Sequence, residues 1–137
     1  ANTMEINEEA KKVISQYAEI VDSRSFDQLD SIMWPDFSMT GGYDLKGIEG
    51  FMGAMDYLVA TYQKTMHLIG NIDGRWDGNV YKGKTYCIAS HIFEENGQMK
   101  KLDMGIIYED TLERRDGAVK FVNRNFNLQW QKTDFID

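Results

Sequence analysis

The fold is decided by residues 65–131, which read TMHLIGNIDGRWDGNVYKGKTYCIASHIFEENGQMKKLDMGIIYEDTLERRDGAVKFVNRNFNLQWQ. Apolar and polar residues alternate in four runs of this stretch, which predicts four long β-strands. The expected strands are Thr65–Arg75, Val80–Phe93, Met99–Arg115 and Ala118–Gln131. Each break between the runs contains a dipeptide that favours a two-residue hairpin turn, namely Asp77-Gly78, Asn96-Gly97 and Asp116-Gly117. Three such turns in series predict an antiparallel meander.

The residues before the meander predict helices. Apolar side chains recur at helical spacing over residues 10–21 and again over 48–62. A shorter helix is expected to begin at Ser25 and to stop at Trp34-Pro35, because proline steers the preceding residue out of the helical region. A short strand is expected at Phe37–Thr40. Helices followed by a meander indicate an α+β domain, and strands this long should curl around the helices as a cone with an open mouth.

Composition narrows the class of protein. With 137 residues, of which 42% are hydrophobic and 27% charged, the chain is expected to form a single domain over residues 1–137. The net charge of −7 argues against nucleic acid as a partner, since an acidic surface repels phosphates. No run approaches the roughly 20 apolar residues that a membrane span needs. The single cysteine, Cys87, and the polar N-terminus fit a cytoplasmic protein, so we expect that location.

Cofactor motifs are not visible in the sequence. Two histidines and one cysteine cannot build a typical structural zinc site, so no metal is expected. The chain also lacks a phosphate-binding glycine loop, a dinucleotide fingerprint and a nucleophile elbow. We therefore expect chemistry that needs no cofactor.

His67 and Asp22 are the first candidates for such chemistry. His67 lies between Met66 and Leu68 in an apolar strand, where it is either a hydrogen-bonded core residue or a general base. Asp22 lies near the end of the first predicted helix, where a negative charge does not help the helix dipole. It is either exposed there or serves as the carboxylate that orients the imidazole.

Tyr17 and Arg124 are the second pair of candidates. Tyr17 lies on the apolar face of the first helix, where it packs in the core or donates its hydroxyl to a substrate oxygen. Alternation along the last strand places Arg124 in a row with Val122, Phe126, Leu128 and Trp130. A cation in such a row needs either a structural ion pair or a ligand that develops negative charge.

Further residues are expected in or near an apolar cavity. His91 is either a residue of the sheet surface or a secondary pocket residue, and Asp103 lies mid-strand as a possible pocket carboxylate. The side chains expected to contact a substrate are Trp34, Phe51, Met55, Asp103, Phe126 and Trp130.

The order of these features resembles a known family. Tyr17 stands five residues before Asp22, and then come the Trp34-Pro35-Asp36-Phe37 step, a glycine before a helix, His67 and the meander. One member of this family, a hexachlorocyclohexane dehydrochlorinase, has a segment similar to Glu113-Arg114-Arg115-Asp116-Gly117, followed by Lys120-Phe121 and Arg124-Asn125. The chain thus resembles the SnoaL-like branch of the NTF2-like superfamily, and within it the group of scytalone dehydratase, hexachlorocyclohexane dehydrochlorinase and bile-acid 7α-dehydratase.

The resemblance implies a function and an assembly. It places the catalytic histidine on His67, its aspartate on Asp22, a tyrosine on Tyr17 and a pocket arginine on Arg124. The implied activity is a cofactor-independent lyase, a dehydratase or dehydrohalogenase acting on a hydrophobic, cyclic molecule. An isomerase or aldol cyclase acting on a steroid-like or polyketide-like molecule, and a non-catalytic binding module, remain alternatives. The resemblance also implies a homo-oligomer, a trimer or a dimer.

Overall fold

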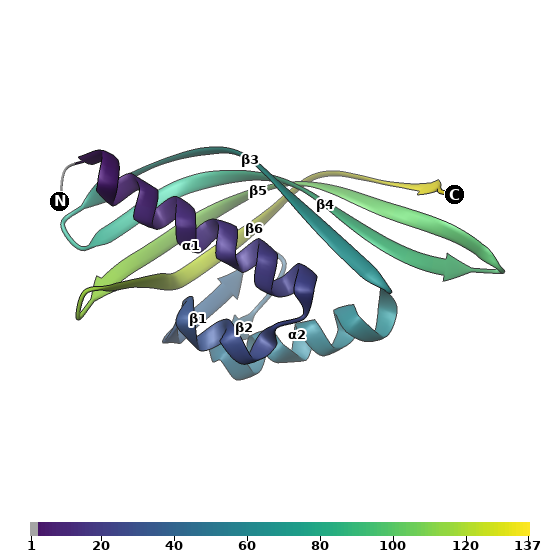
Figure 1. The fold of residues 1–137 in the computed structure, drawn as a ribbon, viewed down its shortest axis with the longest axis horizontal. Coiled ribbons are helices and arrows are strands. Elements are labelled where there is room, and N and C mark those ends of the chain that lie inside the picture. Colours follow the sequence, from purple (N-terminus) through teal and green to yellow (C-terminus); the bar gives the residue numbers. More distant parts are fainter. Residues whose placement is uncertain (1–2) are drawn as a thin grey trace.

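The computed structural model describes residues 3–137, with side chains from residue 8 onward. Two helices and a short 3₁₀ helix precede and interrupt the strands (Figure 1). In chain order the elements are α1 (Thr3–Ser23), η1 (Phe26–Ser31), β1 (Met33–Thr40), β2 (Leu45–Lys46), α2 (Gly47–Thr61), β3 (Lys64–Asp77), β4 (Val80–Glu95), β5 (Gln98–Arg115) and β6 (Ala118–Phe135). No helix in this described part is both long enough and apolar enough to cross a membrane.

The predicted meander is confirmed. The six strands form one sheet in the order β2-β1-β6-β5-β4-β3, and every neighbouring pair is antiparallel except β1 and β6. Both residues of Asn96-Gly97 and of Asp116-Gly117 adopt the positive φ that these hairpin turns require. The turn between β3 and β4 uses Gly78-Asn79, one residue later than predicted.

The helices cover only one face of a curved sheet, which confirms the predicted α+β cone. Figure 1 shows α1 running diagonally across the sheet, with α2 beside β1 and β2 at its end. The core fills the space between the helices and the inner face of the sheet, where the rings of Tyr17, Phe37, Phe51 and Phe121 meet edge to face. No helix of residues 3–137 lies on the opposite, outer face of the sheet (Figure 1).

The second predicted helix is wrong in length. Between α1 and β1 the described structure has the short 3₁₀ helix η1 instead, and β1 already begins at Met33, before the Trp34-Pro35 step. Proline is compatible with this strand because the register of β1 against β6 shifts between Met33 and Ser38. A residue that lacks a backbone N–H can occupy such an irregular stretch without losing a ladder hydrogen bond.

Two bulges in β6 overturn the simple alternation expected for this strand. Pairing moves from Thr111–Asn123 to Leu112–Phe121, which leaves Val122 as an extra residue, and a second shift leaves Gln129 extra. An inserted residue exchanges the two faces for everything that follows it. Arg124 and Phe126 therefore face the helices, whereas Trp130 lies opposite Gly105 on the outer face.

A buried ion pair crosses β5 and β6 under the helices. Arg124 and Asp110 are both fully buried, and Nε of Arg124 lies 2.9 Å from Oδ1 of Asp110. The hydroxyl of Thr85 donates to the other carboxylate oxygen at 2.7 Å. The guanidinium also lies 3.6 Å from the ring centre of Tyr108 and 4.3 Å from that of Tyr17. This arrangement shows that Arg124 has the structural ion pair weighed above as one of its two roles.

We predict that Asp110→Ala lowers the free energy of unfolding by about 3–5 kcal/mol, because it leaves the Arg124 charge buried without its partner. A matched control is Asp36→Ala, which breaks an ion pair between Asp36 and Arg115 at 2.9 Å. The Asp36 side chain is 60% exposed, so the control should cost less than about 1 kcal/mol. Urea unfolding measures both values, and equal costs would contradict the interpretation of the buried pair.

Candidate functional site

A cavity of about 180 Å³ lies between the two long helices and the inner face of the sheet. Its wall is mostly apolar, with Val21 from α1, Met55 and Leu58 from α2, and Ala89 and Ile106 from the sheet. The polar groups in the wall belong to two histidines and five tyrosines, which are His67, His91, Tyr17, Tyr43, Tyr57, Tyr62 and Tyr108. Such a cavity, with few polar groups in an apolar wall, is typical of a small-molecule site.

The structure brings His67 and Asp22 together at the edge of this cavity. His67 points inward from β3, and its Nδ1 lies 2.7 Å from Oδ1 of Asp22 at the end of α1. The backbone N–H of His67 donates to Oδ2 at 2.8 Å, and the hydroxyl of Thr65 donates to Oδ1 at 3.0 Å. The His67 side chain is only 7% exposed and that of Asp22 is 25% exposed. The carboxylate thus binds both the ring and the backbone of the same residue.

The environment of Asp22 keeps the carboxylate ionised. Partial burial alone would raise its pKa, but the hydrogen bonds from the ring and backbone of His67 and from Thr65 outweigh burial, so the pKa is lowered. An ionised carboxylate can only accept hydrogen bonds, so the ring nitrogen that faces it, Nδ1, is the donor. Nε2 of His67 is then the nitrogen left to accept a proton in the cavity.

Tyr17 lines the cavity from α1, whereas Arg124 lies deeper, behind the tyrosine ring. Burial raises the pKa of Tyr17 to about 12, even though the positive charge of Arg124 opposes this. The Tyr17 hydroxyl is therefore protonated at neutral pH and able to donate a hydrogen bond. Nη1 of Arg124 is buried and has no hydrogen-bond partner within the described residues.

Two of the six predicted contact residues, Met55 and Phe126, line the cavity. Phe51 is fully buried below it, where its ring packs against Tyr17 at 5.8 Å. Trp34 lies away from the cavity on β1, and its indole N–H donates to the carbonyl of Glu113 at 2.8 Å. Its ring also contacts the side chains of two basic residues near the β5–β6 turn. These two residues thus serve the core and the strand ends rather than the cavity wall.

Asp103 and Trp130 lie on the outer face of the sheet, in contrast to the prediction. Asp103 pairs with Ser90, whose hydroxyl donates to its carboxylate, and it forms an ion pair with Lys101 at 3.1 Å. Trp130 is 48% exposed. The bulge at Gln129 turns it away from the helices, and its indole fills the space over Gly105 that a Cβ would occupy.

His91 is the functional candidate that sequence reasoning did not place. It is 6% exposed in the cavity wall, and its ring lies 6.4 Å from that of His67 and 4.8 Å from that of Tyr62. Its Nδ1 is 3.1 Å from the carbonyl of Leu102. Burial lowers the pKa of His91, which favours the neutral ring. The Gly78-Asn79 turn alone would pair His91 with Met66. The register shift in β3 between Ile69 and Ile72 places His91 opposite Thr65, two residues from His67 and on the same face, and no sequence signal marks that shift.

Metal binding finds no support in the described residues, which contain no cluster of three or more His, Cys, Asp or Glu side chains able to hold an ion. The side chains gathered around the cavity are instead those of acid–base chemistry. They comprise the His67 imidazole held by a carboxylate, the His91 imidazole, whose pKa is lowered by burial, and several phenols.

Comparison with known proteins finds relatives of the same architecture. Hexachlorocyclohexane dehydrochlorinase type 3 from Novosphingobium barchaimii has a TM-score of 0.83 at 22% identity, over 95% of this chain and 90% of that one. A scytalone dehydratase-like protein from Novosphingobium aromaticivorans has a TM-score of 0.85 at 14% identity, over 98% of this chain and 91% of that one. At these identities the likeness shows a shared fold.

Sequence comparison extends the relationship. An uncharacterized protein of Mycobacterium tuberculosis is 23% identical over 131 residues, which cover 90% of this chain and 86% of the relative. The sequence profile of the SnoaL-like domain matches residues 2–125. The chain therefore belongs to the SnoaL-like domain family, within the NTF2-like superfamily.

Proposed function

We propose that the protein is a cofactor-independent lyase that removes a proton from a small hydrophobic, cyclic substrate through His67. The observation that carries this proposal is the 2.7 Å contact between His67 and Asp22 in the wall of an apolar cavity. A base held by a carboxylate in a water-poor site is suited to abstract a proton from carbon. Two structural neighbours carry the names of a dehydrochlorinase and a scytalone dehydratase-like protein, and both names denote elimination.

The reaction would proceed by elimination. Nε2 of His67 takes a proton from a carbon atom beside the one that bears the leaving group. The electron pair of the broken C–H bond forms the new double bond, and a hydroxide or halide departs. Asp22 stabilises the imidazolium that results, in the same way as the carboxylate of other His–Asp pairs. Tyr17 donates its proton or a hydrogen bond to the departing group.

Arg124 would act on this step through Tyr17 rather than by touching the substrate. Its guanidinium lies 4.3 Å from the centre of the Tyr17 ring, on the buried side. Its charge lowers the cost of negative charge on the phenol oxygen, against the larger effect of burial. Electrostatic support of this kind, fixed before the reaction starts, is an efficient way to stabilise a transition state.

The size of the cavity restricts the substrate. Pockets for drug-sized ligands measure about 300–1,000 Å³, whereas this cavity measures about 180 Å³. A molecule of one or two rings fits this volume better than a steroid. The cavity wall also presents phenols and the His91 ring, whose neutral form burial favours by lowering its pKa, so an uncharged substrate is favoured over a carboxylate or a phosphate.

A second candidate, an isomerase, is favoured by one observation. His91 lies in the same wall with its ring 6.4 Å from that of His67, so a proton taken at one carbon could be returned at another. The two reactions differ in product mass, because elimination removes water or a hydrogen halide and isomerisation removes nothing.

We predict that His67→Ala lowers turnover at least about 100-fold, because general-base catalysis contributes about 10²–10⁴. The substrate is chosen by a thermal-shift screen of one- and two-ring hydroxylated and halogenated ketones, and product is followed by mass spectrometry. Arg75→Ala, at an exposed position of the same strand, is the control and should keep wild-type turnover. Near-full activity of His67→Ala would reject the proposed base.

The ionised state of Asp22 predicts a pH dependence of stability. Its folded-state pKa lies below the ordinary value of 3.8, so its contribution to stability is present above about pH 4 and is lost as the pH falls through the lowered value. In Asp22→Asn, stability should fall less steeply between about pH 5 and pH 3, as measured by urea unfolding. Asp56→Asn, at an exposed position of α2, should follow the wild-type curve. Parallel curves for wild type and Asp22→Asn would contradict the assignment.

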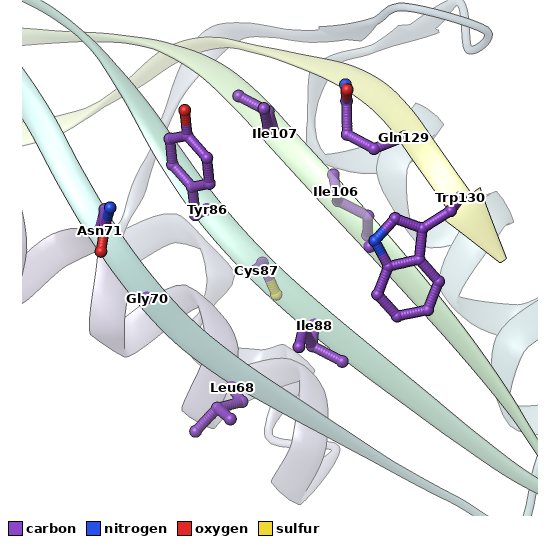
Figure 2. A pocket seen from close by; sticks show the side chains of 11 residues that line it. Leu68, Gly70, Asn71, Tyr86, Cys87, Ile88, Ile106, Ile107, Gln129 and Trp130 are labelled. Atoms are coloured by element: carbon purple, nitrogen blue, oxygen red, sulfur yellow. The ribbon is translucent and has the colours of Figure 1, made fainter.

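We also propose that the outer face of the sheet binds a second copy of the chain. Leu68, Tyr86, Ile88 and Trp130 are 42–59% exposed there, around a hollow of about 370 Å³ (Figure 2). Large apolar side chains gathered in one exposed patch are typical of an interaction surface. An identical copy offers a matching apolar face, as symmetric assemblies require.

The expected mass in solution is therefore a multiple of the 15.8 kDa chain, two- or threefold, when measured by light scattering after size exclusion. Ile88→Lys should shift the protein toward the monomer, because it would bury a charge in the contact. Lys82→Glu, an exposed change on the same strand outside the hollow, should leave the mass unchanged. A wild-type protein that stays monomeric at high concentration would overturn this proposal.

A further inference from the structure

We infer that Arg24 and Thr65 are positioning residues, which form a hydrogen-bond chain that fixes the proton on Nδ1 of His67. The inference rests on the proposed function only for its effect on turnover. Nη1 of Arg24 lies 2.9 Å from the hydroxyl of Thr65, and that hydroxyl lies 3.0 Å from Oδ1 of Asp22. Oδ1 in turn lies 2.7 Å from Nδ1 of His67. Thr65 and His67 of β3 thus meet at the carboxylate of Asp22 from α1, and Arg24 joins them through Thr65.

The direction of the chain follows from its first member. A guanidinium has only donors, so Thr65 must accept from Arg24 and must turn its own proton toward Asp22. Oδ2 of Asp22 already accepts the backbone N–H of His67. Each of these donors favours the carboxylate over the acid. A carboxylate has no proton to give, and Nδ1 of His67 is therefore the donor in the remaining contact.

The backbone conformation at Arg24 places its guanidinium within hydrogen-bond distance of Thr65. Arg24 adopts a φ of 61° directly after α1, in the left-handed region that a residue with a side chain seldom occupies. Its backbone N–H bonds to the carbonyl of Val21 at 3.2 Å, and its guanidinium bonds to the same carbonyl at 2.9 Å. The cation also lies at the negative end of the helix dipole, which is a favourable place for it. Arg24 thus closes the helix and reaches Thr65 from one position.

Thr65 has few other ways to satisfy its hydroxyl. It is 3% exposed on the inner face of β3, opposite His91. Around His67, Asp22 of α1 contacts its ring, the ring of His91 from β4 lies 6.4 Å away, and Tyr62 after α2 and Tyr108 from β5 line the same cavity. Only Asp22 lies within hydrogen-bond distance of Nδ1 among the contacts of the described residues. The hydrogen bonds from Arg24 through Thr65 to Asp22 therefore determine which ring nitrogen of His67 carries the proton.

The test is the tautomer of His67, read from ¹⁵N NMR of the protein without substrate at a pH where the ring is neutral. The wild type should carry its proton on Nδ1. Thr65→Val keeps the shape of the side chain but removes the hydroxyl, and the signal of the Nε2–H tautomer should appear. Thr65→Ser should restore the wild-type signal. Arg24→Met, which keeps an apolar stem, should shift the signal in the same direction as Thr65→Val and supplies the test if Thr65→Val does not fold.

A matched control is Thr85→Val, because Thr85 is also a buried threonine that donates to a carboxylate, that of Asp110. It should leave the His67 signal unchanged. In turnover, Thr65→Val should lower kcat about tenfold with little change in KM, the smaller effect usual for a group that orients another, and Thr65→Ser should recover most of it.

The outcomes separate this inference from the proposed function. An unchanged tautomer in both Thr65→Val and Arg24→Met overturns the inference, whatever the activity of His67→Ala. A shifted tautomer supports the hydrogen-bond chain even if His67→Ala remains active, in which case only the proposed function fails. A loss of turnover in Thr65→Val with an unchanged tautomer also counts against the chain, since the loss would then have another cause.

Discussion

The contact between Asp22 and His67 joins the end of α1 to the first strand of the meander, and the site depends on it. One carboxylate binds the ring and the backbone N–H of His67 and the hydroxyl of Thr65. It can do so only because the sheet curves far enough to bring β3 against the C-terminal end of the helix. The same curvature leaves the cavity between the helices and the strands. The geometry of the Asp22–His67 pair and the space of the cavity are thus set by one feature of the fold.

Much of the fold could be predicted because its signals are local. Hairpin dipeptides and strand alternation act over a few residues, so the meander and its turns were predicted to within a few residues. The bulges at Val122 and Gln129 could not be predicted, since an extra residue changes no composition and its position depends on the partner strand. The second helix was predicted too long for a related reason. Met33 pairs with Phe121 of β6, and this pairing between distant residues extends β1 back to Met33.

The candidate site was predictable in part. Sequence reasoning selected His67, Asp22 and Tyr17 as candidates, and the resemblance to a family supported the choice. The structure places Tyr17 and His67 in the wall of one cavity, with Asp22 hydrogen-bonded to His67. The partner of Arg124 was not foreseen, because Asp110 lies on another strand and nothing in its own neighbourhood marks it as buried. His91 was left open for the same reason, since strand register and not sequence spacing brings it near His67. Residues that meet across strands remain hidden until the register is known.

The extra residue at Gln129 has a consequence for how relatives of this chain are compared. Beyond it, odd and even positions of β6 exchange sides, so that Trp130 faces outward although Phe126 faces the cavity. A relative that lacks this extra residue keeps each remaining side chain on the same side of the sheet, because the residues before and after the bulge retain their partners in β5. Counting alternate positions across Gln129 therefore assigns the wrong side of the sheet to Trp130 and to the residues after it, so homologous columns near the C-terminus should be matched by their partners in β5.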